Sequence, residues 1–365
     1  MGKRLPAWSP FTRCRHKRVG ILFAASCLPV FGQASSMTAE DSILRGVASH
    51  RHGDLNTAAS FLELALSELS KDVNDPKLVN ITLTELGFVR MDQGQLKDAE
   101  LLLRKALAVS RRQGQDSKAA RIVASGNLAL VLTEEAKYTE ADALTSSGLE
   151  EASAVFGPTS KQYATLLAIQ GSIAMGRDQL HQTIKFLERS IAIMQTQRPN
   201  HDELGRAYQN LAAAAAQAGK TKLALGSLRQ ARDEWLSSLP EDHPALIDEQ
   251  NTLICLYLKK RQYQKAYAAT MSLLPRAERI LGPDDPSFAV ILSNAGMIFE
   301  HEALEAQAAA AFQRAYQINL RAFGPMNPKA AYALLGYGKA IAKDGQPAQG
   351  ASLQRRATAL LNTLH

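Results

Sequence analysis

The sequence predicts an all-α fold built from repeated helix pairs, and three periodic features support this. One position with mostly small side chains recurs every 41 or 42 residues along the chain. Two further positions, also mostly small, follow it at fixed offsets of 12 and 19 residues. Seven residues after the first position, four of the eight units have a glycine, the residue best suited to ending a helix. The first position holds Gly46, Gly87, Ala129, Gly171, Ala212, Ile254, Gly296 and Gly338.

The small positions indicate helices that pack closely against one another. Two helices approach only where their facing side chains are small, and the ridges of one then fit the grooves of the other. Larger apolar residues, such as Leu128 and Leu132, are spaced by three and four residues, as the buried face of an amphipathic helix requires. Each unit therefore predicts two helices. The eight predicted units are residues 39–75, 79–114, 121–156, 163–198, 204–239, 246–281, 288–323 and 330–365.

The break between the two helices of a unit is predicted at the position seven residues after the first small one. Glycine is the natural residue there, because it adopts the left-handed conformation that ends a helix at little cost. The glycines at this position are Gly53, Gly94, Gly219 and Gly345, and the other units have Ala136, Asp178, Arg261 and Ala303.

Two units carry the residues of a known repeat most clearly: Leu86, Gly87, Gly94, Ala99, Leu103 and Ala106, and then Leu211, Ala212, Gly219, Ala224, Leu228 and Ala231. This pattern resembles the tetratricopeptide repeat, whose usual unit is about 34 residues. The longer interval here is similar to the kinesin-light-chain type. Its proline-containing linkers are Phe156-Gly157-Pro158, Leu239-Pro240-Glu241-Asp242-His243-Pro244, Leu281-Gly282-Pro283-Asp284-Asp285-Pro286 and Phe323-Gly324-Pro325-Met326-Asn327-Pro328. The resemblance implies a right-handed superhelical α-solenoid of about eight helical hairpins over residues 35–365.

Residues 1–34 predict a signal peptide that is cleaved on export. Six basic residues come first, an apolar stretch from Val19 to Phe31 follows, and small residues lie near Gly32 and Ala34. The apolar stretch has only 13 residues, which is too short to favour a spanning helix over a cleaved leader. The predicted location is the bacterial periplasm or the extracellular space.

Two alternatives to simple cleavage remain open. In the first, Ala24-Ala25-Ser26-Cys27 acts as a lipoprotein cleavage box and the protein is lipid-anchored through Cys27. The box lacks leucine at its start, and apolar residues 28–31 follow it, so simple cleavage is favoured. In the second, the leader is not cleaved and the protein is cytoplasmic.

The leader accounts for the basic character of the chain. The whole sequence has 42 Lys and Arg against 35 Asp and Glu, a formal net charge of +7. Six of the basic residues and none of the acidic ones lie in residues 1–34, which leaves 36 against 35 and a net charge of +1. Because a near-neutral chain with interspersed signs has no stripe that follows phosphates, nucleic acid is not an expected partner.

Cysteine usage predicts no disulfide within the exported chain. Cys14 and Cys27 lie in the leader, so only Cys255 remains. Because Cys255 lies in an apolar run, residues 253–258, we expect a buried and unreactive thiol.

The sequence contains no motif of a known reaction. It has no Gly-rich phosphate loop, no Gly-x-Ser-x-Gly, no His-Glu-x-x-His and no pair of Cys-x-x-Cys motifs. The nearest metal candidate, His50 and His52 with Asp54, lies at a predicted helix end, where a solvated turn is the better interpretation. We therefore expect no enzyme activity, no cofactor, no metal and no small-molecule substrate.

The predicted function follows from shape: a non-catalytic, exported scaffold that binds a protein or peptide segment in a concave groove. The tetratricopeptide resemblance implies that certain offsets from the first small position face this groove. The residues selected are Asn127, Glu134, Arg206, Gln209, Asn210, Gln217, Asn251, Asn294 and Glu300. Asparagine and glutamine both donate and accept hydrogen bonds, so a ladder of amides suits the main chain of an extended peptide. The alternative is that these amides form only a solvated inner surface.

Two other functions remain open at this point. One is a self-associating structural protein, in which exposed Leu360, Leu361 and Leu364 of the last helix contact another copy. The other is a regulatory subunit of a larger envelope or secretion complex. The sequence does not predict an oligomeric state.

Overall fold

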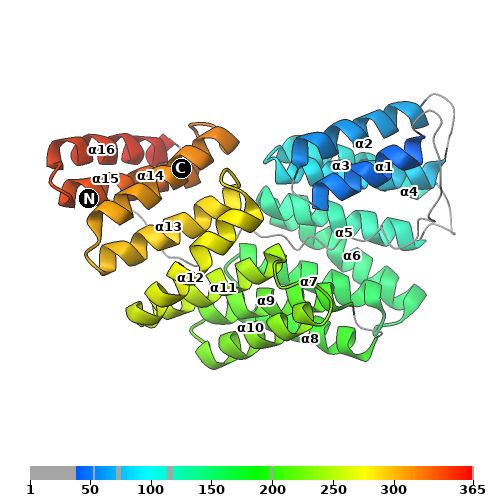
Figure 1. Ribbon diagram of the computed structural model, residues 1–365. Coiled ribbons are helices and arrows are strands. Elements are labelled where there is room, and N and C mark those ends of the chain that lie inside the picture. Colours follow the sequence, from blue (N-terminus) through cyan, green and yellow to red (C-terminus); the bar gives the residue numbers. More distant parts are fainter. Residues whose placement is uncertain (1–37, 52–53, 71–74, 113–117, 198–199, 364–365) are drawn as a thin grey trace. The chain divides into compact units, whose positions relative to one another are not determined.

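The computed structural model describes residues 38–51, 54–70, 75–112, 118–197 and 200–363, and Figure 1 shows their arrangement. Over these ranges the chain forms sixteen α-helices and no strand. The helices follow one another as consecutive pairs joined by short turns. The predicted all-α repeat fold is confirmed. The predicted signal peptide, residues 1–34, lies outside the described residues.

The described chain divides into two compact units, and each is considered by itself. The first ends at Ala218, and the second begins at Gly219. The helices of the first unit are α1 (Ala39–Arg51), α2 (Leu55–Leu69), α3 (Pro76–Asp92), α4 (Leu96–Arg112), α5 (Lys118–Glu134), α6 (Tyr138–Phe156), α7 (Lys161–Gly176), α8 (Leu180–Thr196) and α9 (His201–Gln217).

The second unit contains α10 (Thr221–Leu236), α11 (Pro244–Lys259), α12 (Tyr263–Leu281), α13 (Pro286–His301), α14 (Glu305–Phe323), α15 (Pro328–Lys343) and α16 (Pro347–Thr363). Three of these helices, α11, α13 and α15, begin at the second proline of a linker, two residues before the predicted repeat range. Proline suits the first helical position because its missing N–H has no acceptor there. The residue before it caps the helix, as Asn327 does when its Oδ1 accepts from the Lys329 N–H at 2.8 Å.

Seven of the eight predicted turn positions have the predicted left-handed backbone, and the eighth, Gly53, lies outside the described residues. Gly94, Gly219 and Gly345 have φ of 78°, 75° and 85°. The four non-glycine residues predicted at the same position also have positive φ, between 56° and 61°. Repeat geometry therefore sets this backbone conformation even where the side chain disfavours it. The non-glycine residues are Ala136, Asp178, Arg261 and Ala303.

We expect Ala303→Gly to stabilise the protein. Ala303 has φ of 56°, a conformation that costs an L-residue about 1–2 kcal/mol and costs glycine far less. Glycine also makes the unfolded chain more flexible, so the net gain should be about 0.5–1 kcal/mol. Chemical denaturation of the two proteins measures it. The matched control is Ala310→Gly at an exposed position inside α14, which should lose about 1 kcal/mol. A loss in both variants would contradict the argument.

The small positions make close contacts between the two helices of a pair, as predicted. A Cβ on Gly46 would lie 2.7 Å from Cγ of Leu62, and one on Gly87 would lie 2.9 Å from Cγ of Leu103. Each glycine therefore receives a large side chain from the second helix of its own pair. In the sixth pair the sizes are reversed, because Ile254 lies on the first helix and Thr270 on the second, and both are buried.

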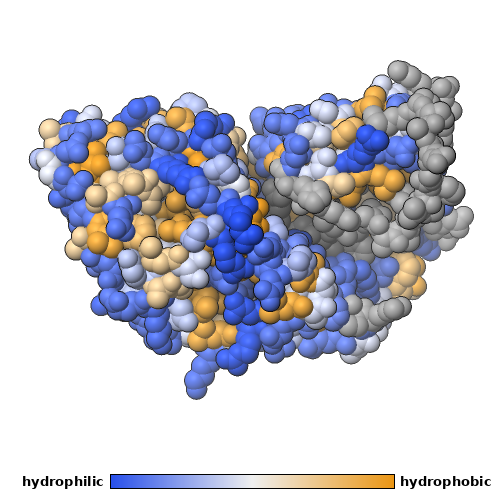
Figure 2. Space-filling view, viewed as in Figure 1, coloured by the Kyte–Doolittle hydropathy of each residue, from blue (hydrophilic) through white to orange (hydrophobic). Residues whose placement is uncertain are grey.

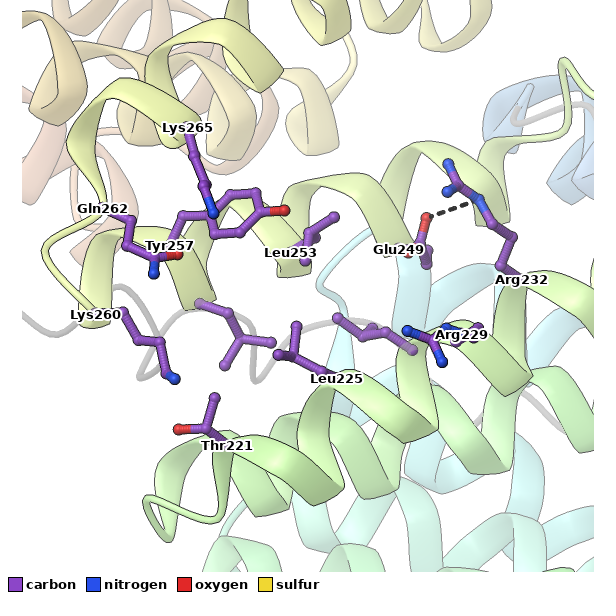
Figure 3. Close-up of a pocket in the computed structure, with 12 residues that line it drawn as sticks. Thr221, Leu225, Arg229, Arg232, Glu249, Leu253, Tyr257, Lys260, Gln262 and Lys265 are labelled. Carbon is purple, nitrogen blue, oxygen red and sulfur yellow. Dashed lines mark ion pairs between the residues drawn. The ribbon is translucent and has the colours of Figure 1, made fainter.

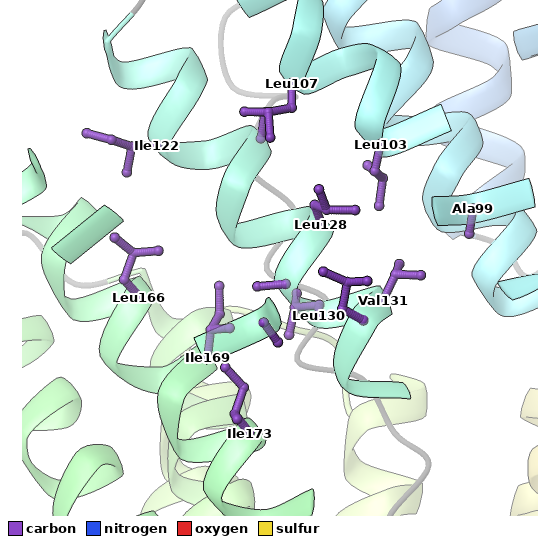
Figure 4. Close-up of a cluster of buried hydrophobic side chains, with 14 of the residues drawn as sticks. Ala99, Leu103, Leu107, Ile122, Leu128, Leu130, Val131, Leu166, Ile169 and Ile173 are labelled. Atoms are coloured by element: carbon purple, nitrogen blue, oxygen red, sulfur yellow. The ribbon is translucent and has the colours of Figure 1, made fainter. Parts of the chain in front are cut away.

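Large apolar side chains fill the space between successive helices of the first unit. Figure 4 shows one such cluster, in which Leu103 of α4, Leu128 of α5 and Leu166 of α7 are drawn. These three side chains are at most 1% exposed. Each fully buried leucine contributes about 1.5–3 kcal/mol by the area it removes from water. Contacts of this kind hold each repeat to its neighbours.

The face of the molecule shown in Figure 2 is mixed in character. Hydrophilic and hydrophobic residues are interspersed on the face shown in Figure 2. Among the described residues, no helix is both long enough and apolar enough to cross a bilayer.

The self-association hypothesis required exposed leucines on the last helix, α16, and the structure differs from this requirement. Leu361 is only 2% exposed, and Leu360 is half-buried. Leu364 lies outside the described residues. The prediction of an exposed Leu361 is wrong, because this side chain lies on the inward face of α16 together with Ala357. An apolar contact through Leu361 therefore does not account for self-association.

Candidate partner-binding site

Four of the nine predicted groove residues lie on α9: Arg206, Gln209, Asn210 and Gln217. All four are partly exposed. Their spacing of three, four and seven residues places them on one side of the helix, over a length of about 16 Å at the usual rise. This stripe of α9 is the most continuous run of predicted groove residues, and we call it the α9 stripe.

The side chains of the α9 stripe differ in how they are held. The Arg206 guanidinium contacts the Asp202 carboxylate one turn earlier, with distances of 3.1 and 3.2 Å. This pair is fixed at one end of the stripe. Among the described residues, the amides of Gln209 and Asn210 make no hydrogen bond, so water or a ligand must satisfy them.

Two other predicted groove residues bond to each other. Asn294 of α13 donates from Nδ2 to Oδ1 of Asn251 on α11 at 2.9 Å, and the same nitrogen lies 3.4 Å from Sγ of Cys255. Asn251 and Asn294 are 7% and 5% exposed. This contact joins the first helices of two successive pairs, so these amides serve packing in this structure. The side chain of Cys255 is buried, as predicted.

The remaining three predicted residues lie in different surroundings. Asn127 of α5 is 3% exposed, and its Nδ2 has no hydrogen-bond partner in the described part of the chain. Glu134 is exposed at the end of α5. Glu300 of α13 is half-buried, and burial raises the pKa of its carboxyl, while Lys343, 3.8 Å away, opposes this effect. The nine residues therefore do not form one uniform set of amides.

A buried charged cluster that joins the first two helix pairs was not predicted from the sequence. His50 of α1 lies between two carboxylates of α3: its Nε2 is 2.7 Å from Oδ2 of Asp92, and its Nδ1 is 3.9 Å from Oε2 of Glu85. All three side chains are at least nine-tenths buried. The solvated turn proposed for His50 is therefore wrong. The signal was present in the sequence, since Glu85 has the same offset from its small residue as Asn127, Asn210 and Asn294, and His50 and Asp92 have the later inward offsets.

The cluster acts as a charge pair rather than as a metal site. Burial lowers the pKa of His50, but its interactions with Asp92 and Glu85 outweigh burial and raise the pKa to about 9. The imidazolium therefore carries its proton at neutral pH, with Nε2 bonded to Asp92 and Nδ1 facing the Glu85 carboxylate. Within the described residues, no group of three or more His, Cys, Asp or Glu has an arrangement that would hold a metal ion.

The consecutive helix pairs define a helical-repeat protein. The polar residues on the first helices of several pairs give it surfaces for binding. Residues 81–112 and 162–233 match two family models that are both described as the tetratricopeptide repeat. These two segments of the chain are therefore tetratricopeptide repeats, the family that the sequence pattern resembles. A comparison with curated proteins finds no match.

Solved structures share the fold at low sequence identity. A signal-transduction ATPase with a tetratricopeptide-repeat sensor from Pyrococcus horikoshii is 10% identical over 90% of this chain, with a TM-score of 0.62; the match spans 49% of that protein. The Rap conjugation regulator of plasmid pLS20, in complex with the Phr* peptide, is 14% identical, with a TM-score of 0.59; the match covers 83% of this chain and 84% of that one. A putative kinesin light chain from Podosopora anserina with nearly identical TPR-like repeats is 16% identical over 54% of this chain and 94% of its own, with a TM-score of 0.44.

Proposed function

We propose that this protein is a non-catalytic scaffold that holds an extended segment of a protein partner on the α9 stripe. The observation that carries the proposal is the pair of unbonded amides at Gln209 and Asn210 on the first helix of a tetratricopeptide hairpin. Each amide offers donors and an acceptor to the backbone of a bound segment, whatever its side chains. The Arg206 and Asp202 pair adds a charged end to the same stripe.

Two further points support a peptide-like partner. Tetratricopeptide repeats typically serve as interaction scaffolds, and the similar Rap regulator is in complex with a peptide. The second point is the absence of a recognised catalytic motif anywhere in the sequence.

The proposed place of action is outside the cytoplasm. The basic, apolar and small segments of residues 1–34 support export with cleavage near Ala34. Sequencing the N-terminus of the protein from fractionated cells tests this. A periplasmic or secreted protein that starts near residue 35 is expected. A lipidated start at Cys27 would replace simple cleavage by anchoring, and a cytoplasmic protein that starts at Met1 would reject export.

The binding proposal is tested by photo-crosslinking in the native host. A photoreactive residue replaces Ala213, which is partly exposed on the same side of α9 about one turn after Gln209 and Asn210, and the crosslinked partner is identified by mass spectrometry. We expect Gln209→Ala with Asn210→Ala to weaken partner binding, read as crosslinking yield, about thirtyfold, because two hydrogen bonds of about 1 kcal/mol each are lost. Asn294 is left unchanged, since its replacement would disturb the buried contact with Asn251.

The matched control is Gln313→Ala with Gln317→Ala, which removes two exposed amides from α14, the second helix of its pair. This control should crosslink as the wild type does. Melting curves of all three proteins should coincide. Undiminished crosslinking in the Gln209 and Asn210 variant would reject the α9 stripe as the binding surface.

A further inference from the structure

A groove between α10 and α11 in the second unit has two equal walls. Figure 3 shows the side chains that line it. Thr221, Leu225, Leu228, Arg229 and Arg232 come from α10, and Glu249, Leu253, Leu256, Tyr257 and Lys260 come from α11. Both walls have the same spacing of four, three, one and three residues, which is one face of a helix. Gln262, the residue that caps the start of α12, and Lys265 of α12 complete the groove, which has a volume of about 430 Å³.

The two walls run antiparallel, which sets the length of the groove. Arg232, the last residue of the α10 wall, lies 3.6 Å from Glu249, the first of the α11 wall. At the other end, Thr221 and Lys260 lie near each other in Figure 3. Eleven residues of helix span about 16 Å. An extended chain of about five residues has this length.

The polar groups gather at the two ends, and the middle is apolar. Arg229 and Arg232 lie at one end with Glu249, and Lys260 and Lys265 lie at the other (Figure 3). Leucines and Tyr257 separate these ends, and Leu225 is 37% exposed. The groove thus offers two cationic ends with an apolar middle.

The single acidic residue of the groove does not neutralise these cations. Glu249 is 3% exposed, and its Oε2 has no hydrogen-bond partner in the described part of the chain. Burial raises the pKa of Glu249 to about 7, with Arg232 opposing the rise. Near neutral pH this carboxyl is partly ionised and lies beside Arg232, so the groove lining keeps the positive charges of Arg229, Lys260 and Lys265.

We propose that this groove binds a second protein segment: an extended stretch of about five residues with a carboxylate side chain near each end and an apolar side chain between them. The carboxylates pair with the two cationic ends, and the apolar side chain covers Leu225 and Leu253. The leader of this chain does not fit, because residues 1–34 contain six basic and no acidic residues. This groove is a different surface from the α9 stripe. It is lined in part by α10, the second helix of its pair, and it recognises charged side chains instead of the main chain of the bound segment.

A fluorescent pentapeptide tests the proposal on the full chain. The probe is acetylated and amidated Glu-Ala-Leu-Ala-Glu, whose carboxylates lie about 14 Å apart when extended. Fluorescence anisotropy should show binding that weakens as salt is added. The matched probe Gln-Ala-Leu-Ala-Gln should bind at least about tenfold more weakly, because charged pairs supply most of the selectivity.

Three variants assign the binding to the groove. Arg229→Glu with Lys265→Glu removes a cation at each end and should weaken the acidic probe at least about tenfold. Lys222→Glu with Arg356→Glu changes the net charge equally at exposed residues outside the groove and should bind within about twofold of the wild type. Glu249→Gln removes the competing carboxyl and should tighten binding.

Several outcomes would overturn the proposal. These are no binding at millimolar protein, equal binding of the two probes, and equal losses in the groove and control variants. A wild-type dimer that Arg229→Glu with Lys265→Glu dissociates would make a second copy the occupant and would also overturn it. The Gln209 and Asn210 variant should bind the probe normally, so failure here is distinguishable from failure of the α9 stripe.

Discussion

Phe312→Ala should lower the free energy of unfolding by about 3–5 kcal/mol, the usual cost of removing a fully buried phenylalanine. Phe312 lies on α14 and is 1% exposed. Its ring fills the space left by two glycines of neighbouring helices: a Cβ on Gly296 would lie 2.8 Å from it, and one on Gly336 would lie 2.7 Å away. One side chain therefore joins α13, α14 and α15, and its loss leaves a cavity at the centre of three helices. Urea denaturation followed by circular dichroism measures the change.

Because Gly296 lies so close to the Phe312 ring, the effect of Gly296→Ala on the free energy of unfolding should change sign when Phe312 is replaced. In the wild type, Gly296→Ala should destabilise, since overpacking costs about 1–3 kcal/mol and exceeds the helix-propensity gain of about 1 kcal/mol. With Phe312→Ala present, the added methyl group enters the cavity, and the same change should stabilise. The matched control is Gly226→Ala on α10, whose Cβ would meet nothing within 4 Å, so it should stabilise in both backgrounds. The same sign for Gly296→Ala in both backgrounds would contradict the packing argument.

His50→Leu should cost about 3–5 kcal/mol at pH 6, the range for removing one partner of a buried ion pair. The variant leaves the carboxylates of Glu85 and Asp92 buried without their cation. Because His50 joins α1 to α3, its loss should let the first helix pair open more readily than in the wild type. Hydrogen exchange of α1 and α2 is the measurement that detects this opening.

The contribution of His50 to folding stability depends on pH, and its raised pKa determines the direction of this dependence. The pKa of His50 is raised from 6.5 to about 9, so folding favours the protonated imidazole. The stability from this shift, about 3 kcal/mol, is fully present below pH 6.5 and is lost as pH rises through 9. The difference between wild type and His50→Leu should therefore shrink by about 3 kcal/mol between pH 6 and pH 9.5. A difference that is constant over this range would show that His50 contributes through packing alone.

Much of the fold was predictable because repetition multiplies a weak signal. A single Gly46 indicates little, but a small residue at the same phase in seven of eight units indicates a contact that every repeat makes. The turn positions were predictable for the same reason, even at Ala303 and Arg261, where the residue type argues against a left-handed backbone. The helix starts at Pro244 and Pro286 follow from the fixed φ of proline.

The candidate sites were less predictable, because an inward offset does not say how far apart two neighbouring helices lie. Asn294 and Asn210 have the same offset, yet Asn294 bonds to Asn251 at the helix interface and Asn210 is partly exposed. His50 and Asp92 are 42 residues apart in the sequence, and the residues next to His50 do not predict their contact. Only the equivalent inward offsets of the two residues in their repeats point to it.

The amino-acid sequence by itself determined the repeat, its helix pairs, its turns and the class of protein, because these depend on local propensity and on side-chain size at a fixed period. Only the tertiary structure decided which polar side chains remain exposed and which are buried in contacts between helices. It also brought Arg229, Lys265 and Glu249 of three helices to one groove. The physical reason is that burial and charge pairing depend on distances between helices, and those distances come from the packed side chains together.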